Sequence, residues 1–558
     1  MSTPKNSSPY TPVLLFSANV ASGIKELSTQ TTNQQGNNNM NRQSMIWQSI
    51  MLVLMAVNAN ALADQILWTQ YCQHQGTMKL LVHLDTDPTK QSTDHPQQVK
   101  LWLREKAEAE WTVADTQPVD HLTATSLFVR HNWPRTSRVF FKVSCGEYSS
   151  EGIFRAEPEK HSVLKVAGLS CHKDIGWPWT EAIAEVISHD PDLVIFTGDQ
   201  IYENDYGSPM FRAQTKEDVP KGMKNYLKKW RKFSEAFREL MRNRPTIMIT
   251  DDHDVFANDL WGNGGVRIDG SRTTGGYPTH PDWVNAAEFT QTGNLPDAVH
   301  PGPHGDGVTA YYTSLEYGGV RFAILEDRKF KSPPSEVISD AIVPAGTKQS
   351  ARIEVVKDPD YDCRTLDRDD LQLLGKEQEA FLKNWAADLK ASGDLGAIVS
   401  SSPWAHIAMY SPTSADLDSN AWPQSGRNRA LKAIGNAPVV MFHGDVHLGT
   451  LGRHGVDEFN DGPVTYSFPS FSSRASRHWE PIVDGNNRLP GAPRHTGEFY
   501  DRFGNKITVY GAGNDLNGYG IILFRPEKRE VELQFHPMNE ERKPIKAIVP
   551  GWPFTVTF

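Results

Sequence analysis

The chain has 558 residues, more than the ~100–200 residues of a typical domain, so we expect more than one domain. Its composition of 38% hydrophobic, 10% aromatic and 22% charged residues is typical of a globular protein. The formal net charge of -10 argues against a nucleic-acid-binding module, because such modules neutralise phosphates with Lys and Arg.

Residues 1–39 are rich in Ser, Thr, Asn and Gln and have little apolar surface to bury. We therefore expect this stretch to be a disordered leader. The alternative is that translation starts at Met40 and that residues 1–39 are a mis-annotated leader. In either case residues 1–39 are not expected to contribute to the fold.

Residues 40–63 have the three parts of a secretory signal peptide. Arg42 supplies a positive charge, Met45 to Val57 form a short apolar run, and Ala61-Leu62-Ala63 provides small residues for cleavage. A membrane anchor is the alternative, but the run is shorter than the roughly 18–20 apolar residues of a membrane span. We predict cleavage after Ala63 and a periplasmic or secreted protein without a stable membrane span.

The four cysteines all follow the predicted cleavage site, so an oxidising compartment would allow disulfides. Cys72 and Cys145 lie at opposite ends of the first predicted domain and form a candidate bridge. Cys171 is interpreted below as a ligand. The sequence gives no role for Cys363.

Residues 64–156 contain short apolar or alternating stretches separated by turn residues, which predicts a small N-terminal β-sandwich domain. The polar residues 157–161 are interpreted as a linker. The predicted strands are Leu80–Leu84, Val99–Leu103, Ser126–Arg130 and Val139–Ser144.

Residues 162–558 alternate apolar runs with helical segments, which is typical of an α/β layered domain. The predicted helices are Trp179–His189, Lys224–Arg242, Asp369–Ser392 and Arg427–Ile434. The predicted strands are Ser162–Gly168, Asp192–Phe196, Pro245–Ile249, Val320–Leu325, Gly396–Val399, Pro438–Phe442, Val464–Phe468, Lys506–Tyr510, Gly518–Phe524 and Glu530–Phe535.

Polar side chains follow five of these strands directly. Ligands collect at the carboxyl ends of strands in α/β sheets, and carboxylates, imidazoles and a thiol together are the donors that metal ions require. These residues are Cys171, Asp199 with Tyr202, Asp251 to Asp254, Glu326 to Arg328, and Asp445 with His447.

Each residue alone has a simpler interpretation. Asp199 could cap a helix, Tyr202 could be a packed aromatic, and Cys171 could be a buried thiol. Three acids in the run Asp251–Asp254 are costly next to an apolar strand unless a cation balances them. The recurrence at successive strand ends therefore favours a metal site.

These motifs resemble the PhoD-like alkaline phosphatase family, within the calcineurin-like metallophosphoesterases, over roughly residues 160–540. The resemblance implies a four-layer αββα sandwich and hydrolysis of phosphate esters. The family order is Cys, Gly-Asp-x-x-Tyr, Asp-Asp-His and Gly-Asp-x-His. The matching residues are Cys171, Asp199 with Tyr202, Asp252 with His253, and Asp445 with His447.

The resemblance also implies roles for these residues. Asp199 would bridge two metal ions, with Cys171 and Tyr202 on Fe(III) and with Ca(II) as the companion ion. Asp252, Asp445 and His447 would complete the ligand set. Two departures stand out: Cys171 replaces the Asp-x-His of the wider superfamily, and Ser400 to Pro403 lack that superfamily's ligand His.

The implied chemistry is attack by a metal-activated hydroxide on phosphorus. His253, with Asp254 as its orienting partner, would protonate or stabilise the leaving group. Arg328 would pair with phosphoryl oxygens through its planar fork. A structural salt bridge is the alternative for Arg328.

Two other functions stay open from the sequence. A phosphodiesterase or phospholipase acting on nucleotides, lipids or cell-wall polymers would use the same residues, and a non-catalytic surface-binding protein would use the sandwich instead. Segments 206–217, 262–303 and 333–363 are rich in Gly, Pro and polar residues and are candidate lids or walls. We expect a monomer that needs a phosphate-ester substrate and no nucleic acid.

Overall fold

The computed structural model describes residues 66–89, 98–268, 274–338, 360–408 and 415–558. The predicted leader and signal peptide, residues 1–63, and most of the predicted lid 333–363 lie outside these residues. Within the described part of the chain, no helix is long and apolar enough to cross a membrane.

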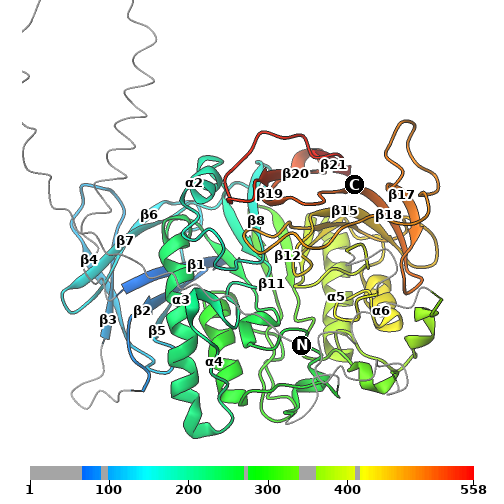
Figure 1. The fold of residues 1–558 in the computed structure, drawn as a ribbon. Helices are drawn as coiled ribbons and strands as arrows, with labels where there is room; N and C mark the ends of the chain where they lie inside the picture. Colours follow the sequence, from blue (N-terminus) through cyan, green and yellow to red (C-terminus); the bar gives the residue numbers. More distant parts are fainter. Residues whose placement is uncertain (1–65, 90–97, 269–273, 339–359, 409–414) are drawn as a thin grey trace, which may run out of the picture. The chain divides into compact units, whose positions relative to one another are not determined.

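Two β-sheets lie at the centre of the structure (Figure 1). The first sheet has the strand order β10-β9-β8-β19-β20-β21, in which β8, β9 and β10 are parallel and the remaining pairs are antiparallel. Its strands are β8 Leu164–Leu169, β9 Leu193–Phe196, β10 Thr246–Met248, β19 Asn517–Arg525, β20 Glu530–Met538 and β21 Phe554–Thr557.

The second sheet has the order β11-β12-β13-β14-β16-β15-β18-β17 and is parallel from β12 through β13 and β14 to β16. The predicted strands of both sheets are present, with only their ends shifted. The strands of the second sheet are β11 Thr313–Tyr317, β12 Val320–Ile324, β13 Leu395–Val399, β14 Val439–His443, β15 Thr450–Gly455, β16 Val464–Ser467, β17 Gly497–Tyr500 and β18 Lys506–Ala512.

Apolar side chains of the two sheets meet in one buried core, in which Val166 and Ile195 of the first sheet lie with Phe322 and Phe442 of the second. Helices cover the outer faces. Helices α2 (Thr180–Ser188), α3 (Val219–Met241) and α4 (Pro281–Thr292) pack on the first sheet, and α5 (Lys376–Ser392) and α6 (Gln424–Ile434) pack on the second. Helices enclose one face of each sheet and the partner sheet encloses the other. Strands buried on both faces in this way carry apolar side chains on both faces. The four-layer αββα prediction is confirmed.

The N-terminal region is β-rich, as predicted, and consists of two further sheets around a separate core that includes Leu80, Phe128 and Phe141. Strand β1 also packs on α3, where the rings of Trp68 and Trp230 meet edge to face at 5.2 Å. The three-stranded sheet has the order β1 (Ile66–His74), β2 (Thr77–Leu84), β5 (Thr125–His131), and the four-stranded sheet β4 (Thr112–Pro118), β3 (Gln98–Arg104), β6 (Val139–Cys145), β7 (Tyr148–Phe154).

The suggested bridge between Cys72 and Cys145 is wrong, because all four cysteines are free and buried. Cys72 lies on β1 and packs in the core between the two large sheets. Cys145 lies on β6 and packs in the N-terminal core instead. The two thiols therefore belong to different hydrophobic cores.

Helix α4 lies inside segment 262–303, where the sequence predicted a lid. Its residues are buried around most of its circumference, including Trp283, Ala287 and Gln291. A helix enclosed in this way lacks the one-sided apolar stripe by which amphipathic helices are recognised. This explains why the sequence did not predict it.

Gly168 of β8 has no side chain, and the ring of Phe468 packs directly against its backbone. A Cβ at Gly168 would lie 2.0 Å from Cζ of Phe468. We expect Gly168→Ala to lower the free energy of unfolding by about 1–3 kcal/mol through overpacking of the core between the sheets. Urea denaturation measures this effect. In a double-mutant cycle with Phe468→Leu, the second substitution should relieve much of the cost. An unchanged midpoint for Gly168→Ala would contradict this packing.

Candidate metal centre

Loops at the carboxyl ends of β8, β9 and β14 turn sharply and present polar side chains to a shared space. Four of these residues have left-handed backbone conformations that are uncommon outside glycine: Cys171 (φ 60°), Asp199 (φ 58°), Asp445 (φ 63°) and His447 (φ 56°). Such conformations cost energy and persist where the surrounding structure fixes them, often at functional sites. Each turn directs its side chain toward the same edge of the sheets.

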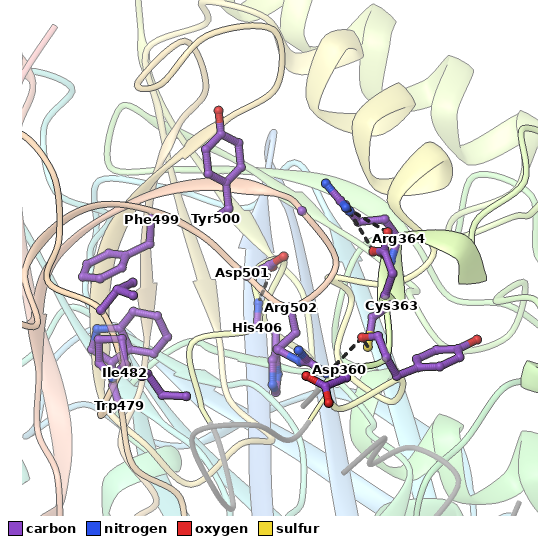
Figure 2. Close-up of a pocket in the computed structure, with 15 residues that line it drawn as sticks. Asp360, Cys363, Arg364, His406, Trp479, Ile482, Phe499, Tyr500, Asp501 and Arg502 are labelled. Atoms are coloured by element: carbon purple, nitrogen blue, oxygen red, sulfur yellow. Dashed lines mark hydrogen bonds and ion pairs between the residues drawn. The ribbon is translucent and has the colours of Figure 1, made fainter. Parts of the chain in front are cut away.

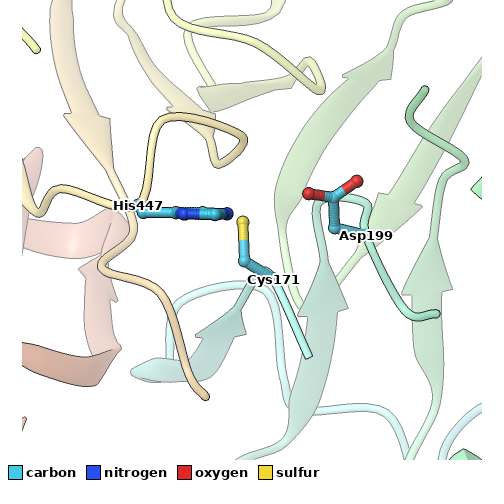
Figure 3. Close-up of side chains that lie close together, drawn as sticks. All are labelled: Cys171, Asp199 and His447. Carbon is cyan, nitrogen blue, oxygen red and sulfur yellow. The ribbon is translucent and has the colours of Figure 1, made fainter. Parts of the chain in front are cut away.

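The first group of side chains is formed by Cys171, Asp199 and His447 (Figure 3). One ligand atom from each lies within 4.8 Å of the others. The Tyr202 hydroxyl donates a 2.8 Å hydrogen bond to Asp199 Oδ2 and lies 3.0 Å from His447 Nε2. The structure thus brings Cys171, Asp199 and Tyr202, which the sequence assigned to one ion, together with His447.

A second group consists mainly of carboxylates and is continuous with the first through Asp199. Asp252 lies within the same 4.8 Å limit of Asp199 and His253, and also of Asp251 and Asp445. The side chains of Asp252 and Asp445 are buried, and the Ser402 hydroxyl donates to Asp445 Oδ2 at 2.6 Å. Every metal ligand predicted from the sequence therefore belongs to one connected cluster.

Burial raises the pKa of the Asp199, Asp251 and Asp445 carboxyls, and the neighbouring carboxylates raise it further. The pKa of the Cys171 thiol is raised for the same two reasons, burial first and then Asp199. These groups are difficult to ionise together unless positive charge lies among them. The cluster therefore fits bound cations.

Two buried oxygens support this fit. Asp199 Oδ1 and Asp251 Oδ2 have no hydrogen-bond partner, and a buried oxygen without a partner is costly. A thiol, a phenol and an imidazole around Asp199 suit a transition metal, whereas the carboxylates of Asp251, Asp252 and Asp445 suit a hard cation. The two groups of donors therefore differ in the metal chemistry that they favour.

Arg328 supplies part of the positive charge, but it lies within the protein and not at an open surface. Its Nε lies 2.6 Å from Asp251 Oδ1, its Nη1 2.6 Å from Asp418 Oδ1, and its Nη2 3.1 Å from Asp445 Oδ2. These contacts match the structural salt bridge that the sequence left open. The pairing of Arg328 with phosphoryl oxygens stays a prediction.

Asp254 does not orient His253, contrary to the sequence prediction. Its carboxylate accepts hydrogen bonds from the backbone N–H groups of Asp199 (2.8 Å), Gln200 (3.0 Å) and Asp251 (2.9 Å). Asp254 therefore ties the loop after β9 to the loop after β10. Its pKa is raised to about 6 because burial outweighs these hydrogen bonds.

Glu203 contacts His253 instead, with Oε2 2.8 Å from Nδ1. Its other oxygen accepts from the Asn258 backbone N–H at 3.1 Å, which fixes the carboxylate in place. The rings of Tyr202 and His253 lie 4.1 Å apart. Burial alone would lower the pKa of His253, but Glu203 and then Asp252 raise it well above the usual value. The sequence missed Glu203 although it directly follows Tyr202, because nothing in the sequence pairs it with His253.

The loop after β13 supplies serine hydroxyls to the carboxylates of the cluster. Ser401 Oγ donates to Asp327 Oδ1 at 2.6 Å and lies 3.0 Å from Asp251 Oδ1. Asp327 also accepts from the Ser401 backbone N–H at 3.0 Å and from Asn420 Nδ2 at 2.6 Å. Asp251 and Asp327 were noted in the sequence without an assigned role. Their contacts show that they organise the carboxylate cluster.

Comparisons with known proteins identify the family of this chain. A sequence model of the family described as PhoD-like phosphatase matches residues 164–478, which is more than half of the chain. No match was found among curated protein sequences.

Solved structures that share the fold include the following two. A structure of PhoD has 16% sequence identity and a TM-score of 0.62, covering 88% of this chain and 90% of that chain. A purple acid phosphatase, PPD1, isolated from yellow lupin (Lupinus luteus) seeds has 12% identity and a TM-score of 0.50, covering 84% of this chain and 71% of that chain. At these identities the likeness concerns the fold alone.

We expect a chelator to lower the thermal unfolding temperature by several degrees, because the buried carboxylates then lose the cations that balance them. Asp199 belongs to both groups of candidate ligands. The variant Asp199→Asn should therefore bind much less metal, and a chelator should change its unfolding temperature much less. Asp297→Asn, at an exposed carboxylate, is the matched control. Elemental analysis and differential scanning calorimetry measure both quantities. Equal metal content in the two variants would argue against the assignment.

Proposed function

Because the chain belongs to the PhoD-like phosphatase family and is therefore a phosphoesterase, we propose that it is an exported, metal-dependent enzyme that hydrolyses phosphate esters. The ligand set is Cys171, Asp199, Tyr202 and His447 for an Fe(III)-like ion. Asp199, Asp252 and Asp445 serve a Ca(II)-like ion, with Asp251 beside them. Other divalent metals suit the oxygen-rich group equally well by donor chemistry.

One observation carries this proposal: buried carboxylates share the end of two sheets with a thiol, a phenol and an imidazole, and two of their oxygens lack a hydrogen-bond partner. Metal ions bound there would supply a hydroxide nucleophile near neutral pH and would neutralise charge on the phosphoryl group. A non-catalytic binding protein would not need this costly concentration of buried acids.

His253 is the proposed acid for the leaving group. Glu203 holds Nδ1 at 2.8 Å, which leaves Nε2 as the ring nitrogen that meets substrate. The carboxylates of Glu203, Asp252 and Asp199 raise the pKa of the ring and favour the protonated form that a general acid requires. Asp254 acts indirectly: its carboxylate accepts a hydrogen bond from the backbone of Asp199 and so fixes the loop that carries this residue.

Diester hydrolysis on nucleotides, lipids or cell-wall polymers is the second candidate, since the same ligands serve both reactions. Wild-type protein purified with its metals should hydrolyse p-nitrophenyl phosphate, bis-p-nitrophenyl phosphate or both. The ratio of the two kcat/KM values separates a monoesterase from a diesterase. Metal-loaded protein that hydrolyses neither compound would refute the proposed function.

We expect His253→Ala to retain the bound metal and to lower kcat by about 10²- to 10⁴-fold, the usual contribution of a general acid. Glu203→Gln should shift the alkaline limb of the kcat profile to lower pH. The reason is that an anion which raises the pKa of His253 is lost, so the protonated form disappears at lower pH. Metal analysis and pH–rate profiles test both variants. Loss of metal from His253→Ala would make His253 a ligand instead.

We expect export to remove residues 1–63, so that the mature protein begins at Asp64. Expression in a bacterial host followed by N-terminal sequencing of periplasmic or secreted protein checks this expectation. Ala63→Arg, which places a large charged residue at the cleavage position, should block processing. A mature chain that begins elsewhere would contradict the predicted cleavage site.

A further inference from the structure

The four-stranded sheet of the N-terminal region has one face that points away from its hydrophobic core. Side chains alternate between the two faces of a strand, and the core positions are Val99 and Leu101 on β3 and Phe141 and Val143 on β6. The residues between them form the outer face and are half-buried or exposed. They are Lys100, Trp102 and Arg104 of β3 and Phe140, Lys142 and Ser144 of β6.

Three aromatic rings and two cations alternate on this outer face, where Trp111 at the start of β4 supplies the third ring. Lys142 Nζ lies 4.9 Å from the ring centre of Trp102 and 5.1 Å from that of Trp111. The Arg104 guanidinium lies 4.2 Å from the ring centre of Trp111 and 5.6 Å from that of Phe140. Each cation is therefore held between two rings.

The cations of the outer face keep their charge, because an aromatic ring holds a cation without neutralising it. Among the described residues, no carboxylate forms an ion pair with Lys100, Arg104 or Lys142. Glu151 of β7 is paired in register with Lys142, yet these two side chains form no ion pair either. Cations that are already fixed in place lose little conformational freedom when an anion binds. The outer face is thus preorganised for a ligand with several negative charges.

A cavity of about 550 Å³ that is partly lined by β17 differs in this respect (Figure 2). One wall is apolar and includes Trp479 and Phe499. Arg364 of the charged wall already forms an ion pair with Asp362, with Nε 2.7 Å from Oδ1. The outer face of the N-terminal sheet is therefore the stronger candidate for an anionic ligand.

Hydroxyl groups lie beside the cations of the outer face. Lys100 is paired in register with Ser144 of β6 and with Thr116 of β4, and Ser144 is paired with Ser149 of β7. The Ser144 hydroxyl accepts a 2.9 Å hydrogen bond from Trp102 Nε1 and keeps its own proton for donation. Cations next to a row of hydroxyls match a ligand that carries both acidic groups and hydroxyls.

We propose that the outer face binds an acidic polysaccharide, with Arg104 and Lys142 on its carboxylates and the row of hydroxyls on its sugar hydroxyls. This binding goes beyond phosphoester hydrolysis and does not depend on it. Single-stranded nucleic acid fits the outer face less well, because its bases stack on open aromatic faces. Here the cations lie over the faces of the Trp102 and Trp111 rings.

Binding of polygalacturonate, a polymer of carboxylated sugars, tests the proposal. The full chain is titrated with this polymer at low salt, with dextran as the uncharged control, and isothermal titration calorimetry gives the Kd. We expect the wild type to bind polygalacturonate and not dextran. Arg104→Gln/Lys142→Gln should weaken binding by about tenfold or more, because two charge-assisted contacts are lost.

Two further variants separate this site from general attraction between charges. Lys383→Gln/Lys528→Gln removes the same charge from two exposed lysines outside the sheet and should leave the Kd unchanged. Trp111→Ala keeps the cations but removes the ring that Arg104 and Lys142 both contact, so it should weaken binding severalfold. Thermal unfolding followed by circular dichroism checks that each variant is folded.

Each contrary result has its own meaning. Wild type that does not bind polygalacturonate, or an equal loss of affinity in Lys383→Gln/Lys528→Gln, overturns the proposal. An unchanged Kd for Trp111→Ala shows that the rings do not fix the cations and overturns it as well. If oligo(dT) or polyglutamate binds more tightly than polygalacturonate and loses affinity in Arg104→Gln/Lys142→Gln, the outer face recognises nucleic acid or an acidic protein, and the polysaccharide proposal is wrong.

Discussion

The remaining structure depends on one constraint. Several buried carboxylates lie close together at the carboxyl ends of the parallel strands of the two sheets. Asp199, Asp251, Asp252 and Asp445 lie in overlapping groups whose ligand atoms are within 4.8 Å of one another. At such distances the repulsion between unscreened carboxylates is large, and burial increases it. The guanidinium of Arg328 contacts two of these carboxylates and Asp418, but unpartnered oxygens remain. The fold is therefore consistent with bound cations as part of the folded state.

The two-sheet core makes this concentration of charge possible. Its strands are enclosed by helices and by the partner sheet, so the loops at their ends can be held rigidly in left-handed turns that isolated peptides avoid. Asp254 shows how the loops are joined, since one buried carboxylate binds the backbone of both the β9 and the β10 loops. Rigid loops keep like charges close together, which flexible loops would not do.

The sequence predicted the fold and the residues that cluster in the candidate site because both depend on local pattern. Long apolar runs followed directly by Asp, Cys or His are visible in the sequence, and strand ends of one sheet converge by geometry. Helix α4 was missed because it is buried on nearly every side and has no apolar stripe. The partner of His253 was also misassigned: Asp254 is its neighbour in sequence, whereas Glu203 comes from a different loop. Contacts between loops that are far apart in the sequence leave no periodic pattern in that sequence.

Arg328 illustrates the same limit for electrostatics. The sequence could not distinguish a substrate-binding arginine from a structural one, because its three carboxylate partners come from three separate loops. Only their arrangement in space shows that the guanidinium is occupied by protein groups.

The loop after β14 joins the candidate metal centre to a buried hydrophobic cluster. Asp445 and His447 point into the metal cluster, while the alternating Val446 and Leu448 pack in the hydrophobic cluster with Trp479. A substitution that alters the packing of this hydrophobic cluster must therefore also disturb the loop that carries two predicted ligands, Asp445 and His447. The positions of Asp445 and His447 consequently depend on how this hydrophobic cluster packs.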